Sequence, residues 1–160
     1  MENSSFLVPA AVWLAIFPLA HLVHFAEEYW CGGGYPAYLF RLRGVRLSTK
    51  RFLIFQTLFF VFFVAVGLIS YQLDFPQFMI TLLGGLFLCN GLSHTVTAIW
   101  DRRYGPGLVS SALLWVPLGI SAIVAMFGQI PNTQFAIAAV VGFSINGAVA
   151  LVTMRGGKLR

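Results

Sequence analysis

Long apolar runs alternate with short polar segments along the whole chain. An α-helix needs about twenty consecutive apolar residues to cross the hydrocarbon core of a bilayer, and the pattern contains five such runs. We therefore predict an all-α protein, a polytopic membrane helical bundle with five transmembrane helices and a single integral membrane domain over residues 1–160. The predicted spans are Phe6–Phe25, Phe52–Tyr71, Phe78–Trp100, Leu108–Phe127 and Phe135–Met154.

The composition supports this interpretation. Hydrophobic residues make up 59% of the chain and charged residues 9%, which is typical of a membrane protein. The five runs leave only short connections, so we expect no separate soluble domain. The opening MENSS lacks the basic residues of a cleaved signal peptide, and we expect the first span to be retained. Cys31 and Cys89 have neither a disulfide spacing nor a zinc spacing, and we expect free thiols.

The basic residues indicate an orientation in the membrane. They crowd into two connections and the C-terminal tail, which face the cytoplasm by the positive-inside rule. We expect a multi-pass protein of the inner (plasma) membrane, with its N-terminus outside and its C-terminus cytoplasmic. This topology and attraction to anionic membrane lipids explain the net charge of +5 better than nucleic-acid binding does. The basic residues are Arg41, Arg43, Arg46, Lys50, Arg51, Arg102, Arg103, Arg155, Lys158 and Arg160.

The sequence HLVHFAEEYW places ionisable groups at the end of the first span. His21, His24 and Glu28 are spaced by three and four residues, so they share one face of a helix, and Glu27 flanks that face. His24 lies roughly 11 Å inward from the middle of the span, which is still within the hydrocarbon. Ionisable groups at that depth are costly and usually face a cavity or one another. The stripe therefore predicts a polar partner on a neighbouring helix.

The third predicted span carries a second polar stripe at a matching depth. Asn90, His94, Thr97 and Asp101 follow one another at steps of four, three and four residues, and His94 lies about 9 Å inward from the middle of the span. The two spans run in the same direction, so we predict that they are neighbours with their stripes facing each other. Weaker polar candidates on the same side of the membrane are Gln56, Ser110, Ser111 and Asn146.

Three motifs together carry a resemblance to a known family. His24–Glu28 reads HxxEE, Asn90 is followed four residues later by His94, and Tyr104–Gly107 reads Tyr-Gly-Pro-Gly. In these features the chain resembles the HXXEE family of small multi-spanning bacterial membrane proteins, whose function is unassigned. The second position of the last motif is Gly, where the family more often has Ser. The resemblance covers most of the chain and implies that these polar residues belong together, without supplying a reaction.

Three interpretations of the polar set remain open. In the first, His24, Glu28 and His94 bind a divalent metal such as zinc or iron, because imidazole and carboxylate groups are normal ligands and three of them leave positions open. In the second, a Glu–His pair works without metal as general base and acid. In the third, the groups only form hydrogen bonds between helices. The candidate catalytic residues are Glu28, His24, His94, Glu27 in an outer position, and Asn90 orienting His94 or a substrate oxygen.

The distribution of polar groups favours an intramembrane enzyme for a lipid-like or otherwise hydrophobic substrate that enters from the cytoplasmic leaflet. Ionisable and amide side chains gather in the inner half of the spans, while the outer half is almost wholly apolar. A reaction site needs one half only, whereas a transport path must cross both, and no internal repeat of the kind many transporters contain is visible. A proton-coupled transporter and an accessory scaffold subunit remain the alternatives. Only the accessory subunit should tolerate substitution of the polar set.

Overall fold

The computed structural model describes residues 8–155, with side chains described through residue 148. The chain is 84% helical, and no strand occurs among the described residues. The helices in chain order are α1 (Ala10–Trp30), the 3-10 turn η1 (Cys31–Gly33), α2 (Tyr35–Arg43), α3 (Thr49–Gln72), α4 (Pro76–Asp101), α5 (Leu108–Ser110), the π-helical turn η2 (Ser111–Trp115), α6 (Val116–Met126) and α7 (Asn132–Arg155).

Among the described residues, four segments are long and apolar enough to cross a membrane, so the chain is a multi-pass membrane protein. They are Ala10–Gly33, Thr49–Gln72, Pro76–Asp101 and Leu108–Met126. Large apolar side chains on their outer faces are exposed, among them Leu58 at 59% and Val124 at 69%, as expected for surfaces that contact lipid. The fifth predicted span lies within the 24-residue helix α7, and its use as a span stays a prediction.

The structure changes two details of the predicted elements. Helix α1 continues to Trp30, so the whole polar cluster is helical and not only its start, while the predicted first residue of that span, Phe6, lies outside the described residues. The connection that follows contains helix α2, which the hydrophobic pattern did not predict because the segment is short and rich in basic residues.

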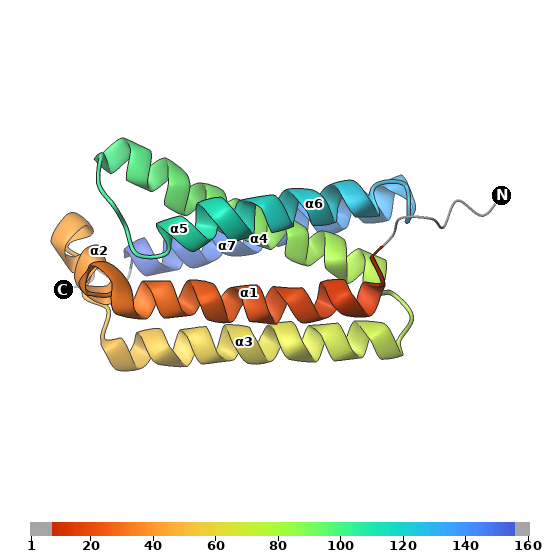
Figure 1. Cartoon of the computed structure of the whole chain (residues 1–160), viewed down its shortest axis with the longest axis horizontal. Helices are drawn as coiled ribbons and strands as arrows, with labels where there is room; N and C mark the ends of the chain where they lie inside the picture. Colours follow the sequence, from red (N-terminus) through yellow and green to blue (C-terminus); the bar gives the residue numbers. More distant parts are fainter. Residues whose placement is uncertain (1–7, 156–160) are drawn as a thin grey trace.

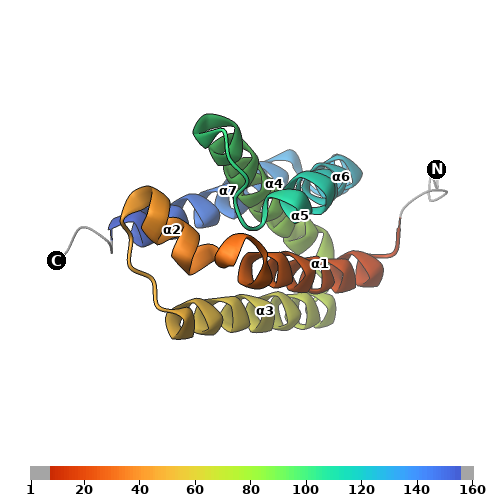
Figure 2. The ribbon, with the colours of Figure 1, turned by 60° about the vertical axis from the view of Figure 1, so that its left-hand side comes forward.

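Helix α4 lies at the centre of the bundle and packs against both α6 and α7 (Figure 1). Close packing requires small residues there: a Cβ on Gly85 would lie 2.6 Å from the Ala139 carbonyl oxygen, and one on Gly119 would lie 2.7 Å from the Leu88 nitrogen. Helix α1 packs mainly against α3, and the two run side by side in Figures 1 and 2. A site between α1 and α4 therefore joins these two groups of helices.

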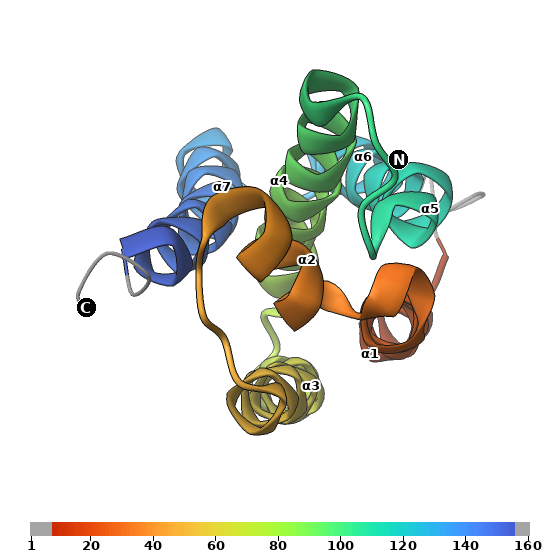
Figure 3. The ribbon, with the colours of Figure 1, turned by 90° about the vertical axis from the view of Figure 1, so that its left-hand side faces the viewer.

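Helix α2 lies across one end of the bundle, in the middle of the end-on view of Figure 3. Glycines with positive φ flank it, Gly34 before it and Gly44 after it, with φ of 84° and 67°. Its Tyr38 and Leu39 are buried. The Nη2 atom of Arg43 donates to both carboxylate oxygens of Asp101, at 3.1 and 2.9 Å, and so ties α2 to the end of α4.

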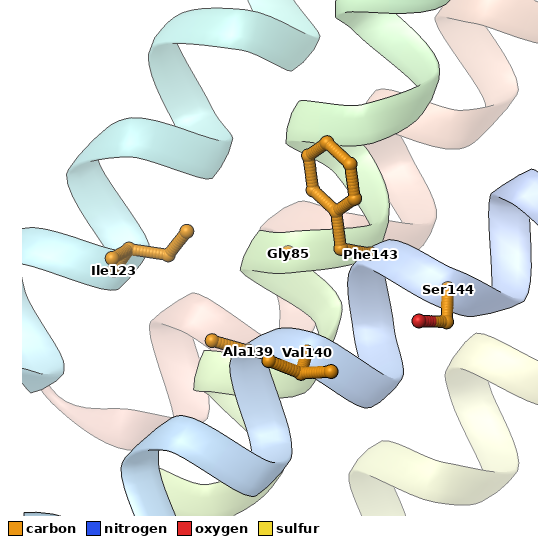
Figure 4. Close-up of a pocket in the computed structure, with 6 residues that line it drawn as sticks. All are labelled: Gly85, Ile123, Ala139, Val140, Phe143 and Ser144. Carbon is orange, nitrogen blue, oxygen red and sulfur yellow. The ribbon is translucent and has the colours of Figure 1, made fainter.

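Two apolar grooves of about 300 Å³ each open between helices. Figure 4 shows the first, where Gly85 of α4 and Ile123 of α6 face Ala139, Val140, Phe143 and Ser144 of α7. The second lies between α1 and the η2–α6 segment, with Trp13 and Leu114 among its lining residues. Both are lined almost entirely by apolar groups, and neither includes a residue of the polar stripes.

Candidate metal centre

Three potential metal ligands converge between α1 and α4. His24 and Glu28 stand one turn apart on α1, and His94 faces them from α4. The Oε1 atom of Glu28 lies 3.6 Å from Nε2 of His24 and 3.3 Å from Nε2 of His94. One ligand atom from each residue lies within 4.8 Å of the others. The two histidine ring centroids are 4.9 Å apart, which confirms the predicted contact between the two helices at this depth.

This triad of His24, Glu28 and His94 is deeply buried. His24 is 2% exposed and Glu28 3%, and the His94 side chain is 13% exposed. The Nε2 atom of His24 is buried and has no hydrogen-bond partner. Buried polar atoms are almost always paired, so an unpaired nitrogen pointing at a carboxylate oxygen and a second imidazole is a local deficit that a bound cation would remove.

Aromatic packing fixes one side of the triad. The Trp115 ring lies against the His24 ring at 4.2 Å between centroids and stacks on Phe87 at 4.0 Å. Trp115 ends the π-helical turn η2, in which the Val116 N–H donates to the Ser111 carbonyl five residues back. Val116 is followed by Pro117, which has no backbone N–H and so cannot donate the next α-helical hydrogen bond. Such π-turns are frequent at functional sites.

Helix α3 contributes a hydrogen bond to the triad through Gln56. The Gln56 Nε2 donates to the Oε2 atom of Glu28, so Oε1 is the carboxylate oxygen that remains for another partner. The backbone carbonyl of Gln56 accepts a hydrogen bond of 3.0 Å from Nε2 of His21. His21 therefore faces α3 and aromatic side chains, and it lies outside the triad.

Glu27 points away from the triad toward the start of α5. Its Oε1 accepts hydrogen bonds from the Tyr104 hydroxyl at 2.8 Å and the Val109 N–H at 2.9 Å. Its Oε2 accepts from the Ser110 N–H at 2.6 Å and from the Ser110 hydroxyl at 2.5 Å. Burial, together with the hydrogen bond to Glu27, raises the pKa of the Tyr104 phenol, which therefore stays protonated and donates.

The turn from Tyr104 to Gly107 closes over the triad. A Cβ on Gly107 would lie 2.7 Å from Cε1 of His24, 2.9 Å from Cε1 of His94 and 3.0 Å from Cγ of Glu28. The residue also has φ of 88°, which favours glycine. The sequence predicted only a turn in this segment. In the structure, Gly107 lies directly against all three residues of the triad.

Tyr35, at the start of α2, is a further neighbour that sequence reasoning missed. Its ring lies 5.8 Å from the His94 ring between centroids. Burial and the nearby negative charge of Glu28 raise the pKa of its phenol, so it is a neutral hydroxyl beside the triad. No spacing rule links a tyrosine in the connection after the first span to a distant helix, so the sequence carried no signal for it.

The second polar stripe divides between neighbours. Asn90 donates from Nδ2 to Oδ1 of Asn146 on α7, at 3.0 Å, and Asp101 pairs with Arg43 of α2, while His94 faces α1. Four residues advance a helix by 400°, so Asn90 and His94 are offset by about 40° around the axis. Because α4 has neighbours on both sides, that offset is enough to direct them to different helices.

The weaker sequence candidates also divide. Gln56 contacts Glu28 directly, and the Ser110 hydroxyl lies 2.8 Å from Nδ1 of His24. The Ser111 hydroxyl is buried without a hydrogen-bond partner. Both cysteines are free, Cys31 exposed and Cys89 buried, as predicted.

Comparison with known proteins gives one family. A family model described as "Protein of unknown function with HXXEE motif" matches residues 15–122, which is more than half of the chain. No curated protein and no solved structure matches.

Proposed function

The chain belongs to this HXXEE family, and we propose that it is an intramembrane enzyme whose His24, Glu28 and His94 bind a divalent metal such as zinc or iron. One observation carries the proposal: the three ligand atoms converge within 4.8 Å of one another in a buried position. Two imidazoles and one carboxylate suit both metals, and three protein ligands leave coordination positions for a substrate.

The distances support a metal fit. Ligand atoms about 2.0–2.2 Å from a tetrahedral zinc ion are about 3.3–3.6 Å apart. Two of the three ligand pairs fall in this range, since Oε1 of Glu28 lies 3.3 Å from Nε2 of His94 and 3.6 Å from Nε2 of His24. All three ligand atoms lie within 4.8 Å of one another. The atoms left free by the surrounding hydrogen bonds are also the right ones, since Gln56 occupies the other oxygen of Glu28 and Nε2 of His24 has no partner. Bound at these atoms, a metal would act as a Lewis acid inside the bilayer.

The substrate class in this proposal is a lipid-like or otherwise hydrophobic molecule. The triad lies within the candidate membrane spans, and the outer faces of those spans are apolar. The histidines and glutamates of the spans lie in the C-terminal halves of α1 and α4. Both helices end at the side of the bundle that holds α2 (Figures 1 and 3). A molecule with an apolar tail among lipids and a polar head at that depth would meet the triad from the membrane.

The proposed topology is a single integral domain with five spans, α7 being the fifth, in the inner (plasma) membrane. Every Lys and Arg whose side chain the structure describes lies in α2, in the segment that leads from α2 into the first turn of α3, or in the connection after α4, at one end of the bundle. By the positive-inside rule that end is cytoplasmic, which puts the N-terminus outside and the C-terminus inside. The triad then opens toward the cytoplasmic leaflet.

Metal binding is the first test. The protein is purified in detergent, stripped with a chelator, and titrated with Zn²⁺ and, without oxygen, Fe²⁺. We expect about one ion per chain at a three-ligand site, and loss of binding in His24→Ala, Glu28→Gln and His94→Ala. His21→Ala is the matched control, because His21 is equally buried on the same helix. A wild-type protein that binds neither metal overturns the metal centre and leaves the metal-free acid–base pair.

The enzyme assignment needs a second test in cells. Membrane lipids and hydrophobic metabolites are compared between cells that produce the wild-type protein and cells that produce the folded Glu28→Gln variant. We expect a lipid product that depends on Glu28. An unchanged profile together with loss of uptake of a solute would replace the enzyme by the transporter. An unchanged profile with normal uptake would favour the accessory subunit.

A further inference from the structure

The two adjacent glutamates of the HxxEE motif face different neighbours. Consecutive residues on a helix are 100° apart, and Glu28 lies in the triad while Glu27 reaches α5. The Glu27 carboxylate accepts from four donors: the hydroxyls of Tyr104 and Ser110 and the N–H groups of Val109 and Ser110. Since every partner is a donor, Glu27 is an acceptor only, and its oxygens are already used.

The Ser110 hydroxyl connects Glu27 to the triad. Its oxygen lies 2.5 Å from Oε2 of Glu27 and 2.8 Å from Nδ1 of His24. A hydroxyl has one proton to donate, and the carboxylate, which has none, takes it. The serine oxygen therefore accepts from His24, so the proton of the His24 ring is on Nδ1.

This proton position decides which nitrogen is available. A neutral imidazole with its proton on Nδ1 has a bare Nε2, and Nε2 is the atom that faces Glu28 at 3.6 Å and has no partner. A bare nitrogen beside a carboxylate oxygen is unfavourable unless a cation lies between them. In metal sites a hydrogen bond to the second ring nitrogen fixes the tautomer and the ring orientation of a ligating histidine.

We propose that Glu27 acts through Ser110 as a positioning residue, which holds His24 in the Nδ1–H tautomer and reserves Nε2 for the metal. The inference rests on the proposed metal centre and adds a role for the second glutamate of the motif. Gln56 orients Glu28 in a similar way, because its hydrogen bond to Oε2 leaves Oε1 free for the metal. Each α1 ligand is thus oriented by a residue from a different helix.

The tautomer can be read directly from ¹⁵N nuclear magnetic resonance of the metal-free protein, because protonated and bare ring nitrogens have distinct shifts. His24→Gln identifies the His24 signals. We expect Nδ1–H in the wild type and a mixture that includes Nε2–H in Ser110→Ala, since Nε2–H can then donate to Glu28. Ser110→Thr keeps the hydroxyl and should restore Nδ1–H. Ser111→Ala is the matched control, because Ser111 is an adjacent buried serine without a hydrogen-bond partner.

Zinc affinity of the same variants gives the second readout. Loss of an orienting partner typically weakens metal binding about 10- to 100-fold, and we expect this for Ser110→Ala but not for Ser110→Thr or Ser111→Ala. Nε2–H in the wild type, or an unchanged tautomer in Ser110→Ala, overturns the positioning role even if zinc binds. If the tautomer changes as expected but the wild type binds no metal, the metal centre fails and the control of the His24 tautomer by Ser110 stands.

Discussion

Substituting Gly107 with alanine tests whether the Tyr104–Gly107 turn closes the triad. The new Cβ would lie 2.7–3.0 Å from atoms of His24, His94 and Glu28, whereas carbon atoms normally approach to about 3.5 Å. Relief requires movement of roughly 0.5–0.8 Å, and metal ligands tolerate only about 0.2 Å. We therefore expect Gly107→Ala to weaken zinc binding at least tenfold, the size of effect seen when a supporting group of a metal site is lost.

The stability cost has two parts that a control can separate. An L-residue at a left-handed φ costs about 1–2 kcal/mol, and overpacking a filled site costs about 1–3 kcal/mol more. Gly44 has φ of 67° and nothing within 4 Å of a Cβ built on it, so Gly44→Ala isolates the backbone part. We expect Gly107→Ala to lose about 2–5 kcal/mol of unfolding free energy and Gly44→Ala only the first part.

The measurements are thermal unfolding in detergent and zinc competition against a chromophoric chelator, on both variants and the wild type. Gly44→Ala should bind zinc as the wild type does. If Gly107→Ala unfolds at the same temperature as Gly44→Ala and binds zinc with wild-type affinity, the turn does not pack on the triad and the closed site is refuted.

The remaining predictions concern topology and the residues around the triad. Single cysteines at Ser4 and Ser48, in a chain without its native cysteines, should be labelled from opposite sides of the membrane; equal labelling from outside contradicts the topology. Gln56→Leu removes the donor to Glu28 and should weaken zinc binding about tenfold; unchanged affinity in competition titration would show that the bond does not orient the ligand. Asn90→Ala breaks the bond to Asn146 and should lower the unfolding temperature without changing zinc affinity, and loss of zinc would place Asn90 in the site after all.

The long apolar helices and the members of the triad were predictable because apolar runs and ionisable groups within them are visible in the local sequence. A run of apolar residues long enough to cross a bilayer is helical whatever surrounds it, since lipid leaves backbone groups no other partner. His24, Glu28 and His94 stood out because ionisable groups are rare in such runs. Their spacing and depth then indicated which helices would meet.

The rest depended on contacts that a one-dimensional pattern does not contain. Asn90 shares a stripe with His94, yet the central position of α4 gives the two residues different partners. Gly107 packs on the triad because the connection after α4 returns to the bundle at that point. Ser110 bonds to His24 and Glu27 because the start of α5 lies against that face of α1. The sequence predicted only that Glu27 lies on a face beside the triad. Its hydrogen-bond partners come from α5 and the turn before it, and their position depends on the tertiary fold.

Helix α2 lies across one end of the bundle and places Tyr35 beside His94, so we expect an opening of α2 to limit how fast solutes reach the triad from that end. Lifting it exposes the buried Tyr38 and Leu39, at a cost of about 1.5–3 kcal/mol for each side chain. It also breaks the Arg43–Asp101 ion pair, which at an exposed position is worth about 0–1 kcal/mol. Gly34 and Gly44 have positive φ at its two ends, and we expect the backbone to bend there when α2 lifts. An opening this costly is populated only at the per cent level or below. If a chelator reaches zinc only when α2 is open, the rate of zinc removal should rise with chelator concentration and then reach a plateau. Its limiting rate is then the opening rate of α2, which Asp101→Asn should raise.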